Sequence, residues 1–364
     1  MRVLLIFSSS ELGGAERSLT RMALAESNGV EYTLATMDGA GPWVDWCEQH
    51  GVSPVGLGAG NANSRHGVSR IRSLINLVKL ARRERYDFLY VIGFRVSLYL
   101  RFLKPILRGA RLVHGIRWNP DSNSRLDRAV RLTERVFGAL VDGYVCNSKV
   151  AADTLIKRAS VPSTKVNVIY NGLDRLPPPE DNLSDRPPNI LVLANLAPRK
   201  GHIDFLDVVT AVRRQVPRAH FFFVGRDEMG GQIDKEIARR ALKDAVTLTG
   251  FQADIAPWFD SSRLMVLPSL WGEGCPTSIL EGFAHGLPVI AYAVDGVPEL
   301  IEDGSDGVLV PPQDSASMAR AVVHMLEDPD LAASMGENGR EKVGRSFTLA
   351  HCANRHVDLF LNWR

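Results

Sequence analysis

The sequence has few of the features that mark metal-binding, disulfide-bonded or membrane-spanning proteins. Its 364 residues include only four cysteines, and these are far apart with no metal-ligand or redox spacing. This pattern favours a reducing compartment, because stable disulfides form in oxidising ones. No apolar run approaches the roughly 18 residues that a membrane helix needs. The opening MRVLLIF is also too short for the apolar core of a signal peptide. We therefore expect a cytoplasmic protein.

The net charge is close to zero, but basic and acidic residues are unevenly distributed along the chain. The formal charge is +2, with 25 Lys and Arg against 15 Asp and Glu in residues 1–175 and 18 against 26 in the remainder. The excess is densest in Arg65–Arg131, which holds 16 basic and 4 acidic residues. Its basic members include Arg70, Arg72, Lys79, Arg82, Arg83, Arg85, Arg101, Lys104, Arg108 and Arg111.

Such a basic run has two interpretations. It forms either ordinary solvated helix faces or a surface that meets an anionic membrane or a lipid diphosphate. Near such a surface each basic side chain contributes about 1 kcal/mol. The run lacks the interleaved aromatic side chains and the motifs of nucleic-acid binding, so we expect no nucleic-acid partner.

Strands and helices alternate along the whole chain, whose length suits two domains. The predicted strands are 3–7, 32–36, 53–57, 88–92, 111–116, 143–146, 189–194, 220–224, 246–248, 264–267, 289–292 and 307–310. The alternation predicts an α/β fold with parallel sheets, and ligands at the carboxyl ends of the strands. We expect domains at 1–175 and 189–345, a proline-rich linker at 176–188, and a tail at 346–364 that packs back on the first domain. A cleft between the two sets of strand ends would hold the chemistry.

The stretch Leu264–Leu300 carries the most informative residues. A strand ends at Pro268, a loop holds Glu273, and the following helix holds Glu281, with seven residues between the two carboxylates. The helix N-terminus offers unpaired N–H groups and the positive end of a dipole, which suit a phosphate. A carboxylate on either side could hold sugar hydroxyls. This arrangement predicts a nucleotide-sugar site.

Other candidate residues follow strand ends elsewhere. Gly13 and Gly14 open a helix whose backbone could approach a phosphate or sugar, although a plain strand-to-helix turn looks the same. His114 is either a hydrogen-bonded structural histidine or a functional one. Lys200 could stabilise a departing diphosphate, or be a surface lysine. Cys275 could be a reactive thiol near a helix N-terminus, but we favour a small packing side chain.

Taken together, these segments resemble the retaining nucleotide-sugar glycosyltransferases of family 4, whose GT-B fold consists of two facing Rossmann-like domains. The resemblance covers most of the chain and is strongest over Asn189–Pro312. In the family's order, the matching segments are GGAER (13–17), HG (114–115), VIYNGLD (168–174), ANLAPRKGH (194–202), FFFVGR (221–226), VTLTGF (246–251), EGCPTSILE (273–281) and HGLPVIAYAVDGVPELI (285–301).

The resemblance implies roles for the matching residues. Glu281 would bind the ribose hydroxyls and Glu273 those of the transferred sugar. Lys200 would neutralise the departing diphosphate, and His114 would contact the donor sugar near the reacting centre. Glu273, His114 and Lys200 are thus the implied catalytic group. The implied substrate contacts are completed by Gly13, Gly14, Asn195, Arg199, Gly250, Phe251, Gly274, Cys275, Pro276, Thr277 and Ser278.

Two positions depart from the family's pattern. Asn195 stands where the family often has arginine, so the usual second cation on the diphosphate is missing there unless Arg199 replaces it. Cys275 stands where an aromatic residue is common, which leaves the shape of the sugar pocket open. An acidic metal-binding pair is not evident, so we expect no metal and no cofactor.

The resemblance implies a reaction and leaves two alternatives. A hexosyl-type sugar would move from a UDP- or GDP-sugar to a glycan or lipid-linked saccharide, with retention, in bacterial surface polysaccharide biosynthesis at the inner face of the membrane. One alternative is an epimerase or phosphorylase on the same fold, against which the Glu273–Glu281 loop argues. The other is a non-catalytic GT-B-like binding or assembly subunit. Asn195 favours that subunit, whereas Lys200 and His114 oppose it.

Overall fold

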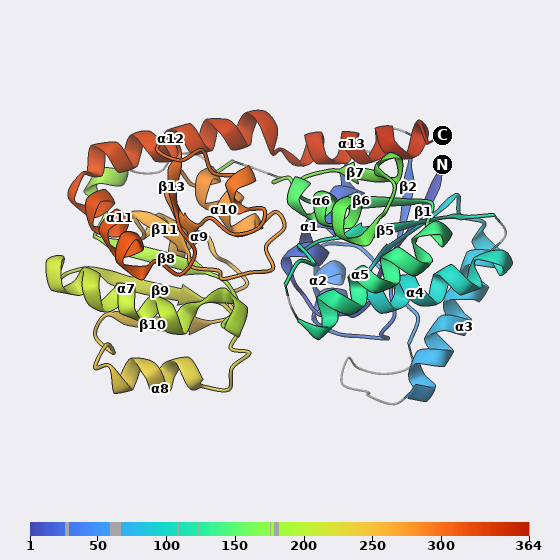
Figure 1. Cartoon of the computed structure of the whole chain (residues 1–364), viewed down its shortest axis with the longest axis horizontal. Helices are drawn as coiled ribbons and strands as arrows, with labels where there is room; N and C mark the ends of the chain where they lie inside the picture. Colours follow the sequence, from blue (N-terminus) through green and yellow to red (C-terminus); the bar gives the residue numbers. More distant parts are fainter. Residues whose placement is uncertain are drawn as a thin grey trace. The chain divides into compact units, whose positions relative to one another are not determined.

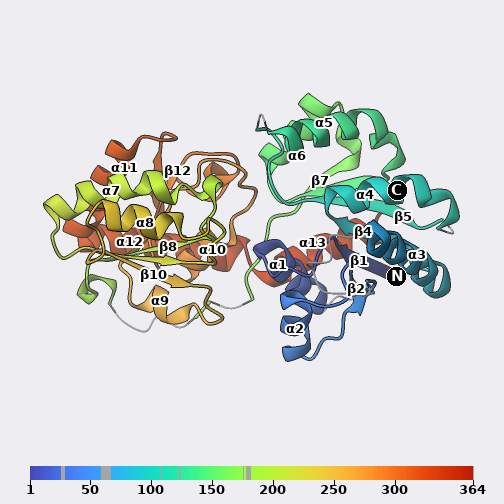
Figure 2. The same cartoon turned by 90° about the horizontal axis from the view of Figure 1, so that it is seen from below.

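The chain folds into two compact units in the computed structural model (Figures 1 and 2). The structure describes residues 1–25, 29–58, 67–107, 109–122, 124–174, 176–177 and 182–363. Unit 1 comprises Met1–Gly172 and Leu349–Arg364, and unit 2 comprises Leu173–Thr348. The predicted cleft between the two sets of strand ends stays a prediction. Arg65 and Arg108 of the basic run, and residues 178–181 of the predicted linker, lie outside the described residues.

Unit 1 is built on a parallel sheet whose described strands have the order β3-β2-β1-β4-β5-β6-β7. The strands are β1 Arg2–Phe7, β2 Glu31–Thr36, β3 Val55–Gly56, β4 Phe88–Ile92, β5 Arg111–Ile116, β6 Gly143–Cys146 and β7 Val166–Val168. β1 and β4 pair with each other and are buried over nearly their whole length, as expected where helices cover both faces. The strand order reverses between them, which marks their carboxyl ends as a place for ligands.

Helices cover both faces of this sheet, as Figure 2 shows for α5 and α6 on one side and α1 and α2 on the other. The helices and 3-10 turns of unit 1 are α1 Gly14–Leu24, α2 Pro42–Gln49, α3 Gly67–Glu84, α4 Phe94–Leu103, η1 Lys104–Ile106, α5 Arg125–Phe137, η2 Gly138–Leu140, α6 Lys149–Ala159, η3 Ser163–Lys165 and α13 Leu349–Leu361. One apolar core includes residues of α3, α4 and α6, and the other those of α1, α2 and α13. Val357 and Phe360 of α13 thus complete a core made mainly by the first half of the chain.

Unit 2 repeats the design with a parallel sheet whose described strands have the order β10-β9-β8-β11-β12-β13. The strands are β8 Asn189–Leu193, β9 His220–Val224, β10 Val246–Gly250, β11 Leu264–Leu267, β12 Val289–Tyr292 and β13 Gly307–Val310. The helices and 3-10 turns are η4 Leu183–Asp185, η5 Pro198–Lys200, α7 His202–Gln215, α8 Gln232–Arg239, α9 Ala256–Asp260, α10 Thr277–Ala284, η6 Val297–Glu299, α11 Ser315–Glu327 and α12 Pro329–Ser346. Again the strand order reverses, here between β8 and β11.

Most predicted strands coincide with observed ones, whereas several helices were missed. β4, β5, β6, β9, β11, β12 and β13 have the predicted bounds, and β3 is shorter than predicted. The sequence patterns gave no sign of α2, α9, α12 or α13. In α12, Gly336 and Gly339 look like helix breakers, but an added Cβ there would collide with Gly286 and Phe283. These glycines therefore serve close packing on α10.

The unit boundary lies just before the predicted linker of 176–188. The chain leaves unit 1 after Gly172 and returns to it after Thr348. The described part of the proline-rich segment packs within unit 2, where η4 contacts α12 and Arg186 donates hydrogen bonds to the carbonyls of Phe259 and Ser262. Over the described parts of the chain, no helix combines the length and apolar character needed to cross a membrane.

Candidate functional site

Unit 2 brings most of the predicted residues to the carboxyl edge of its sheet. Asn195 follows β8, Phe251 follows β10, and the loop with Glu273 follows β11. Because the carboxyl ends of parallel strands share one edge, these side chains are gathered without being close in sequence. Two residues that the sequence did not single out, Arg226 after β9 and Asp295 after β12, join them there.

The centre of this edge is an ion pair between Lys200 and Glu273. Lys200 Nζ donates to Glu273 Oε1, and Arg199 Nη1 lies 3.9 Å from the same oxygen. Burial lowers the pKa of Lys200 against the opposing effect of Glu273. Burial would raise the pKa of Glu273, but Lys200 outweighs it and holds this pKa below its usual range. Glu273, which we predict to bind the sugar, and Lys200, which we predict to bind the diphosphate, therefore pair with each other when no donor is bound.

Backbone geometry holds the two loops of this pair together. Leu270 donates its backbone N–H to the Arg199 carbonyl at 2.8 Å. The Asp295 carboxylate accepts from the backbone N–H groups of Gly272 at 2.6 Å and Glu273 at 3.1 Å. Gly201 has φ +70, and an added Cβ would collide with the Pro268 carbonyl, so only glycine fits there.

The loop then enters α10, the predicted seat of the diphosphate. No described side chain caps this helix, whose N-cap residue is Pro276. Cys275 is buried and is not part of a disulfide, and its packing role stays a prediction. Gly274 and Pro276 are also buried, whereas Thr277, Ser278 and Glu281 are half-buried along the helix.

Asn195, where a cation was expected, supports a neighbouring turn. Its Nδ2 donates to Glu228 Oε1 at 2.7 Å, and its Oδ1 accepts from the backbone N–H of Arg226 at 3.2 Å. The Arg226 guanidinium lies 5.8 Å from the centre of the Phe251 ring, beside Gly250. The amide thus fixes the turn that carries a different arginine.

In unit 1, Gly13 and Gly14 begin α1 as predicted, but a carboxylate already lies over this helix N-terminus. An added Cβ at Gly13 would lie 2.7 Å from Glu16 Oε2. Burial raises the pKa of Glu16, while the backbone N–H groups of Glu16 and Gly13 and the charge of Arg117 oppose this rise. The carboxyl group of Glu16 therefore lies beside the glycine turn, at the place that the sequence assigned to a phosphate or sugar.

His114 lies in a buried network on the other side of the unit 1 sheet. Its Nδ1 is 3.2 Å from Glu134 Oε1, which Arg101 Nη2 contacts at 2.6 Å, and Tyr144 donates to Glu134 Oε2 at 2.6 Å. Burial raises the pKa of Glu134, but His114 and Arg101 outweigh burial and hold it at about 2. These contacts match the structural alternative stated for His114, and its catalytic role stays a prediction.

Two family models match consecutive parts of the chain. One, described as Glycosyltransferase Family 4, matches residues 12–175. The other, described as Glycosyl transferases group 1, matches residues 187–328, so together they span well over half of the chain. The chain belongs to glycosyltransferase family 4.

Relatives and solved structures agree with this assignment. This family 4 chain is 26% identical over 312 residues to a UDP-Gal:alpha-D-GlcNAc-diphosphoundecaprenol alpha-1,3-galactosyltransferase of Escherichia coli, covering 81% of this chain and 80% of that protein. It is 26% identical over 357 residues to the lipopolysaccharide core biosynthesis glycosyltransferase LpsE of Rhizobium meliloti, covering 95% of each. A crystal structure of Anabaena HepE with UDP and glucose superposes with a TM-score of 0.84 at 22% identity, over the whole of both chains. The fold is therefore GT-B, and the protein is a glycosyltransferase, as the sequence predicted.

Several residues beside the candidate site residues were not singled out from the sequence. Asp295 holds the Glu273 loop, and its Asp-Gly sequence is a turn signal that could have suggested this role. Glu16 stands at the third position of α1, where a carboxylate commonly reaches back to the helix N-terminus. Arg117 donates to Asn171 Oδ1, which also accepts from Ser18 Oγ at 3.1 Å. Only the folded sheet brings these last residues together.

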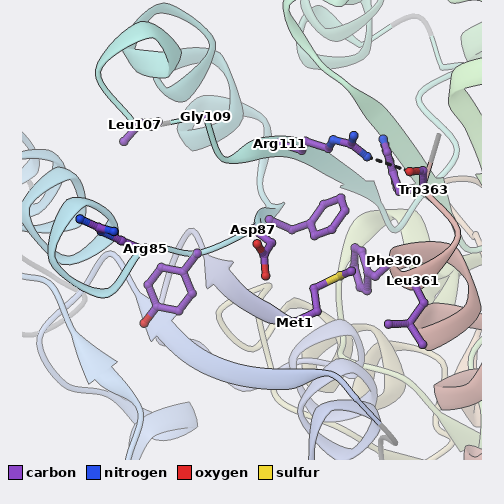
Figure 3. Close-up of a pocket in the computed structure, with 11 residues that line it drawn as sticks. Met1, Arg85, Asp87, Leu107, Gly109, Arg111, Phe360, Leu361 and Trp363 are labelled. Atoms are coloured by element: carbon purple, nitrogen blue, oxygen red, sulfur yellow. Dashed lines mark hydrogen bonds between the residues drawn. The ribbon is translucent and has the colours of Figure 1, made fainter.

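Unit 1 also has a pocket, whose lining residues are shown in Figure 3. Its volume is about 940 Å³, and its lining includes Arg85, Phe88, Arg111, Phe360 and Trp363. Arg111 donates to the Trp363 carbonyl at 3.0 Å across its rim. The pocket adjoins the amino ends of β4 and β5, the opposite edge of the sheet from Gly13 and Gly14. In the described ranges no group of three His, Cys, Asp or Glu residues could hold a metal ion.

Proposed function

We propose that this glycosyltransferase moves a hexosyl-type sugar from a uridine or guanosine diphosphate sugar to a glycan or lipid-linked saccharide, with retention of the anomeric configuration. The process would be the synthesis of a bacterial surface polysaccharide. The Lys200–Glu273 pair beside the N-terminus of α10 carries this proposal. A lysine, a carboxylate to which we assign sugar binding, and a helix N-terminus at one strand edge support the proposal.

An exchange of partners would couple donor binding to this pair. A diphosphate that approaches α10 attracts Lys200 more strongly than a single carboxylate does, because it carries more charge. Glu273 would then be free to accept hydrogen bonds from the hydroxyls of the sugar. Glu281, further along the same helix, would bind the ribose hydroxyls. The Escherichia coli relative is named for a UDP-galactose donor, so UDP-sugars are the first donors to test.

The bond changes need no covalent intermediate with the protein. The bond between the anomeric carbon and the diphosphate oxygen breaks with oxocarbenium character, and Lys200 and the first N–H groups of α10 stabilise the departing oxygen. The acceptor oxygen then bonds to the same face of the sugar, and its proton passes to the departing diphosphate. Arg199 is the candidate second cation. Nδ1 of His114 contacts Glu134. We therefore propose that His114 contacts the donor sugar through its Nε2 or its backbone.

A panel of UDP- and GDP-sugars tests the reaction, with nucleotide release as the measurement. We expect one donor to give saturable release and a product whose anomeric configuration, read by NMR, equals that of the donor. Lys200→Ala should lower the rate of release by roughly 10² to 10³, whereas Lys243→Ala, which changes an exposed lysine of the same unit, should leave the rate unchanged. Inversion in the product, or no release from any donor, would contradict the proposal.

The acceptor and the cellular location follow from different evidence. The Escherichia coli relative is named for a diphosphoundecaprenol-linked acceptor, and LpsE for lipopolysaccharide core synthesis. A lipid-linked acceptor requires the enzyme to reach the inner face of the membrane. We therefore include contact between the basic run of unit 1 and anionic lipid in the proposed function.

A further inference from the structure

Two neighbouring helices of unit 1 expose large apolar side chains. Tyr99 and Phe102 of α4 and Leu132 and Val136 of α5 are between 41% and 63% exposed, and Ile106 in η1 is 46% exposed. We call these five residues the α4–α5 ridge. Most of the exposed large apolar side chains that the structure describes in unit 1 lie on α3, α4, α5 or the turns that follow them. Concentrations of this kind mark contact surfaces.

The ridge is continuous across the two helices. α4 and α5 lie side by side in both views of Figures 1 and 2, and they contact each other. Phe102 packs edge to face on Phe137 of α5, with ring centres 5.2 Å apart. Tyr99, Phe102 and Ile106 recur at helical spacing on the outer side of α4, and Leu132 and Val136 recur on that of α5.

The exposed charged residues that the structure describes on α4 and α5 are all arginines. The helix α4 has no acidic residue, and its Arg95 is exposed. Both acidic residues of α5, Asp127 and Glu134, are buried. The arginines Arg125, Arg128 and Arg135 of α5 are exposed. Burial of the two carboxylates therefore turns an ordinary mixed-charge helix into one with a basic outer face.

The buried network around Glu134 explains why this face points outward. Arg101 of α4 and Glu134 of α5 form an ion pair with both side chains fully buried, and Tyr144 of β6 also binds Glu134. Rotating α5 to bury Leu132 would separate this pair, and breaking a buried pair is costly. The network thus fixes the orientation of α5, and the ridge stays in solvent unless something else covers it.

We propose that the α4–α5 ridge inserts into the interface of an anionic membrane, with the flanking arginines on lipid phosphates. Helices with aromatic and aliphatic residues on one face and arginines beside them bind at the boundary of head groups and acyl chains. This inference rests on the membrane contact in the proposed function. The membrane contact is then made by α4 and α5 and not by the whole of Arg65–Arg131, and it includes insertion of apolar side chains as well as charge attraction. Both helices start near the carboxyl ends of β4 and β5, so a lipid-borne acceptor would arrive at that edge of unit 1.

Vesicle flotation tests the insertion. We expect the full chain to float with phosphatidylcholine vesicles that contain phosphatidylglycerol, and Phe102→Ser/Leu132→Ser to partition about tenfold less, because two large apolar groups are lost. Leu24→Ser removes a side chain that is 50% exposed on α1 of the same unit and should change nothing. Arg125→Ser/Arg128→Ser should weaken binding only to anionic vesicles, unlike the unit 2 control Arg214→Ser/Arg218→Ser.

A second measurement reports depth rather than affinity. In Phe102→Trp, fluorescence should be quenched by lipids brominated on the acyl chain, beyond the quenching of the wild type. Partition that depends on lipid charge but not on Phe102 and Leu132, or no added quenching, would overturn insertion. So would light scattering that shows a wild-type dimer and a monomeric Phe102→Ser/Leu132→Ser variant, because the ridge would then be covered by a second copy.

Nucleotide release without vesicles separates this inference from the proposed function. Phe102→Ser/Leu132→Ser should release nucleotide from the donor as the wild type does. If the protein binds vesicles through the ridge but accepts no donor, the proposed reaction is wrong and the proposed membrane insertion stands. If the protein turns over donor but never binds vesicles, the proposed membrane insertion is wrong and the proposed reaction stands.

Discussion

Each unit holds a buried glutamate that is paired with a basic side chain, yet the two pairs are built from different parts of the fold. In unit 1, Glu134 meets Arg101 and His114, which come from a helix and the interior of a strand. In unit 2, Glu273 meets Lys200, and both lie in loops at the carboxyl edge of the sheet. The first pair is fully buried among the helices and the sheet of unit 1. The second is held by the backbone turns at Gly201 and Asp295.

This difference separates a structural pair from the pair that we propose to be functional. A pair within the layers can only be broken by moving a helix, so its energy contributes to folding and to the orientation of α5. A pair at a strand edge can exchange partners with a ligand without moving any helix. A strongly shifted pKa occurs in both, as expected, because structural networks and active sites perturb titration alike. Location in the fold, more than charge, therefore distinguishes Glu273 from Glu134.

The largest expected effect is on folding and comes from unit 1. Glu134→Gln leaves Arg101 buried without its counter-charge and should lower the free energy of unfolding by about 3–5 kcal/mol. Guanidinium denaturation measures this loss. Glu84→Gln, which weakens a partly exposed pair with Arg2, should cost far less stability than Glu134→Gln. Equal costs for the two substitutions would break the comparison between the units.

The next effect is on catalysis and comes from unit 2. Lys200→Ala should lower turnover by roughly 10² to 10³, the usual cost of removing one group that stabilises a developing negative charge. Its stability loss should be smaller than that of Glu134→Gln, because Arg199 remains within reach of Glu273. Single-turnover kinetics and denaturation on the same preparation decide this. A variant that unfolds yet turns over normally would make the pair structural.

Acid should destabilise both units through buried histidines. Burial lowers the pKa of His202 in unit 2 to about 3 and that of His356 in unit 1 to about 4. Because both folded pKa values lie below the unfolded value of about 6.5, the stabilising effect of the neutral rings is complete above that pH and is lost as pH falls toward 4 and 3. Denaturation between pH 7.5 and 4.5 should show this loss.

A variant makes the pH experiment specific to unit 2. His202→Phe should flatten the slope, because the ring packs on Phe223 with centres 5.3 Å apart and both of its nitrogens lack hydrogen-bond partners among the described residues. The exposed control, His324→Gln, should leave the slope unchanged. An unaltered slope in His202→Phe would place the acid sensitivity elsewhere.

The smallest expected effect concerns the second cation on the diphosphate. Arg199→Ala should raise the donor KM by about tenfold if Arg199 replaces the missing arginine, with a stability change below about 1 kcal/mol because its pair with Glu273 is long and partly exposed. Arg226→Ala measures the competing candidate beside Phe251. If only Arg226→Ala raised KM, the second cation would come from the turn after β9.

The sequence by itself determined the α/β class, most strands and the family. Apolar runs of strand length are readable because parallel strands are buried on both faces, and motifs are readable because glycine, proline and charged residues in loops have local causes. Glu273, Lys200 and Asn195 could therefore be named from the sequence. The helix α12 could not, since its glycines serve packing on α10 rather than chain reversal.

Only the tertiary structure decided which charged residues are paired and which side chains face solvent. Sequence spacing cannot tell that Lys200 binds Glu273, that Glu16 covers the glycine turn, or that His114 joins Arg101 and Glu134. Those contacts join residues far apart in the chain, and the sheet order sets which of them meet. The same packing buries both carboxylates of α5 and leaves its apolar and basic residues outside, which no count of charges along Arg65–Arg131 could reveal.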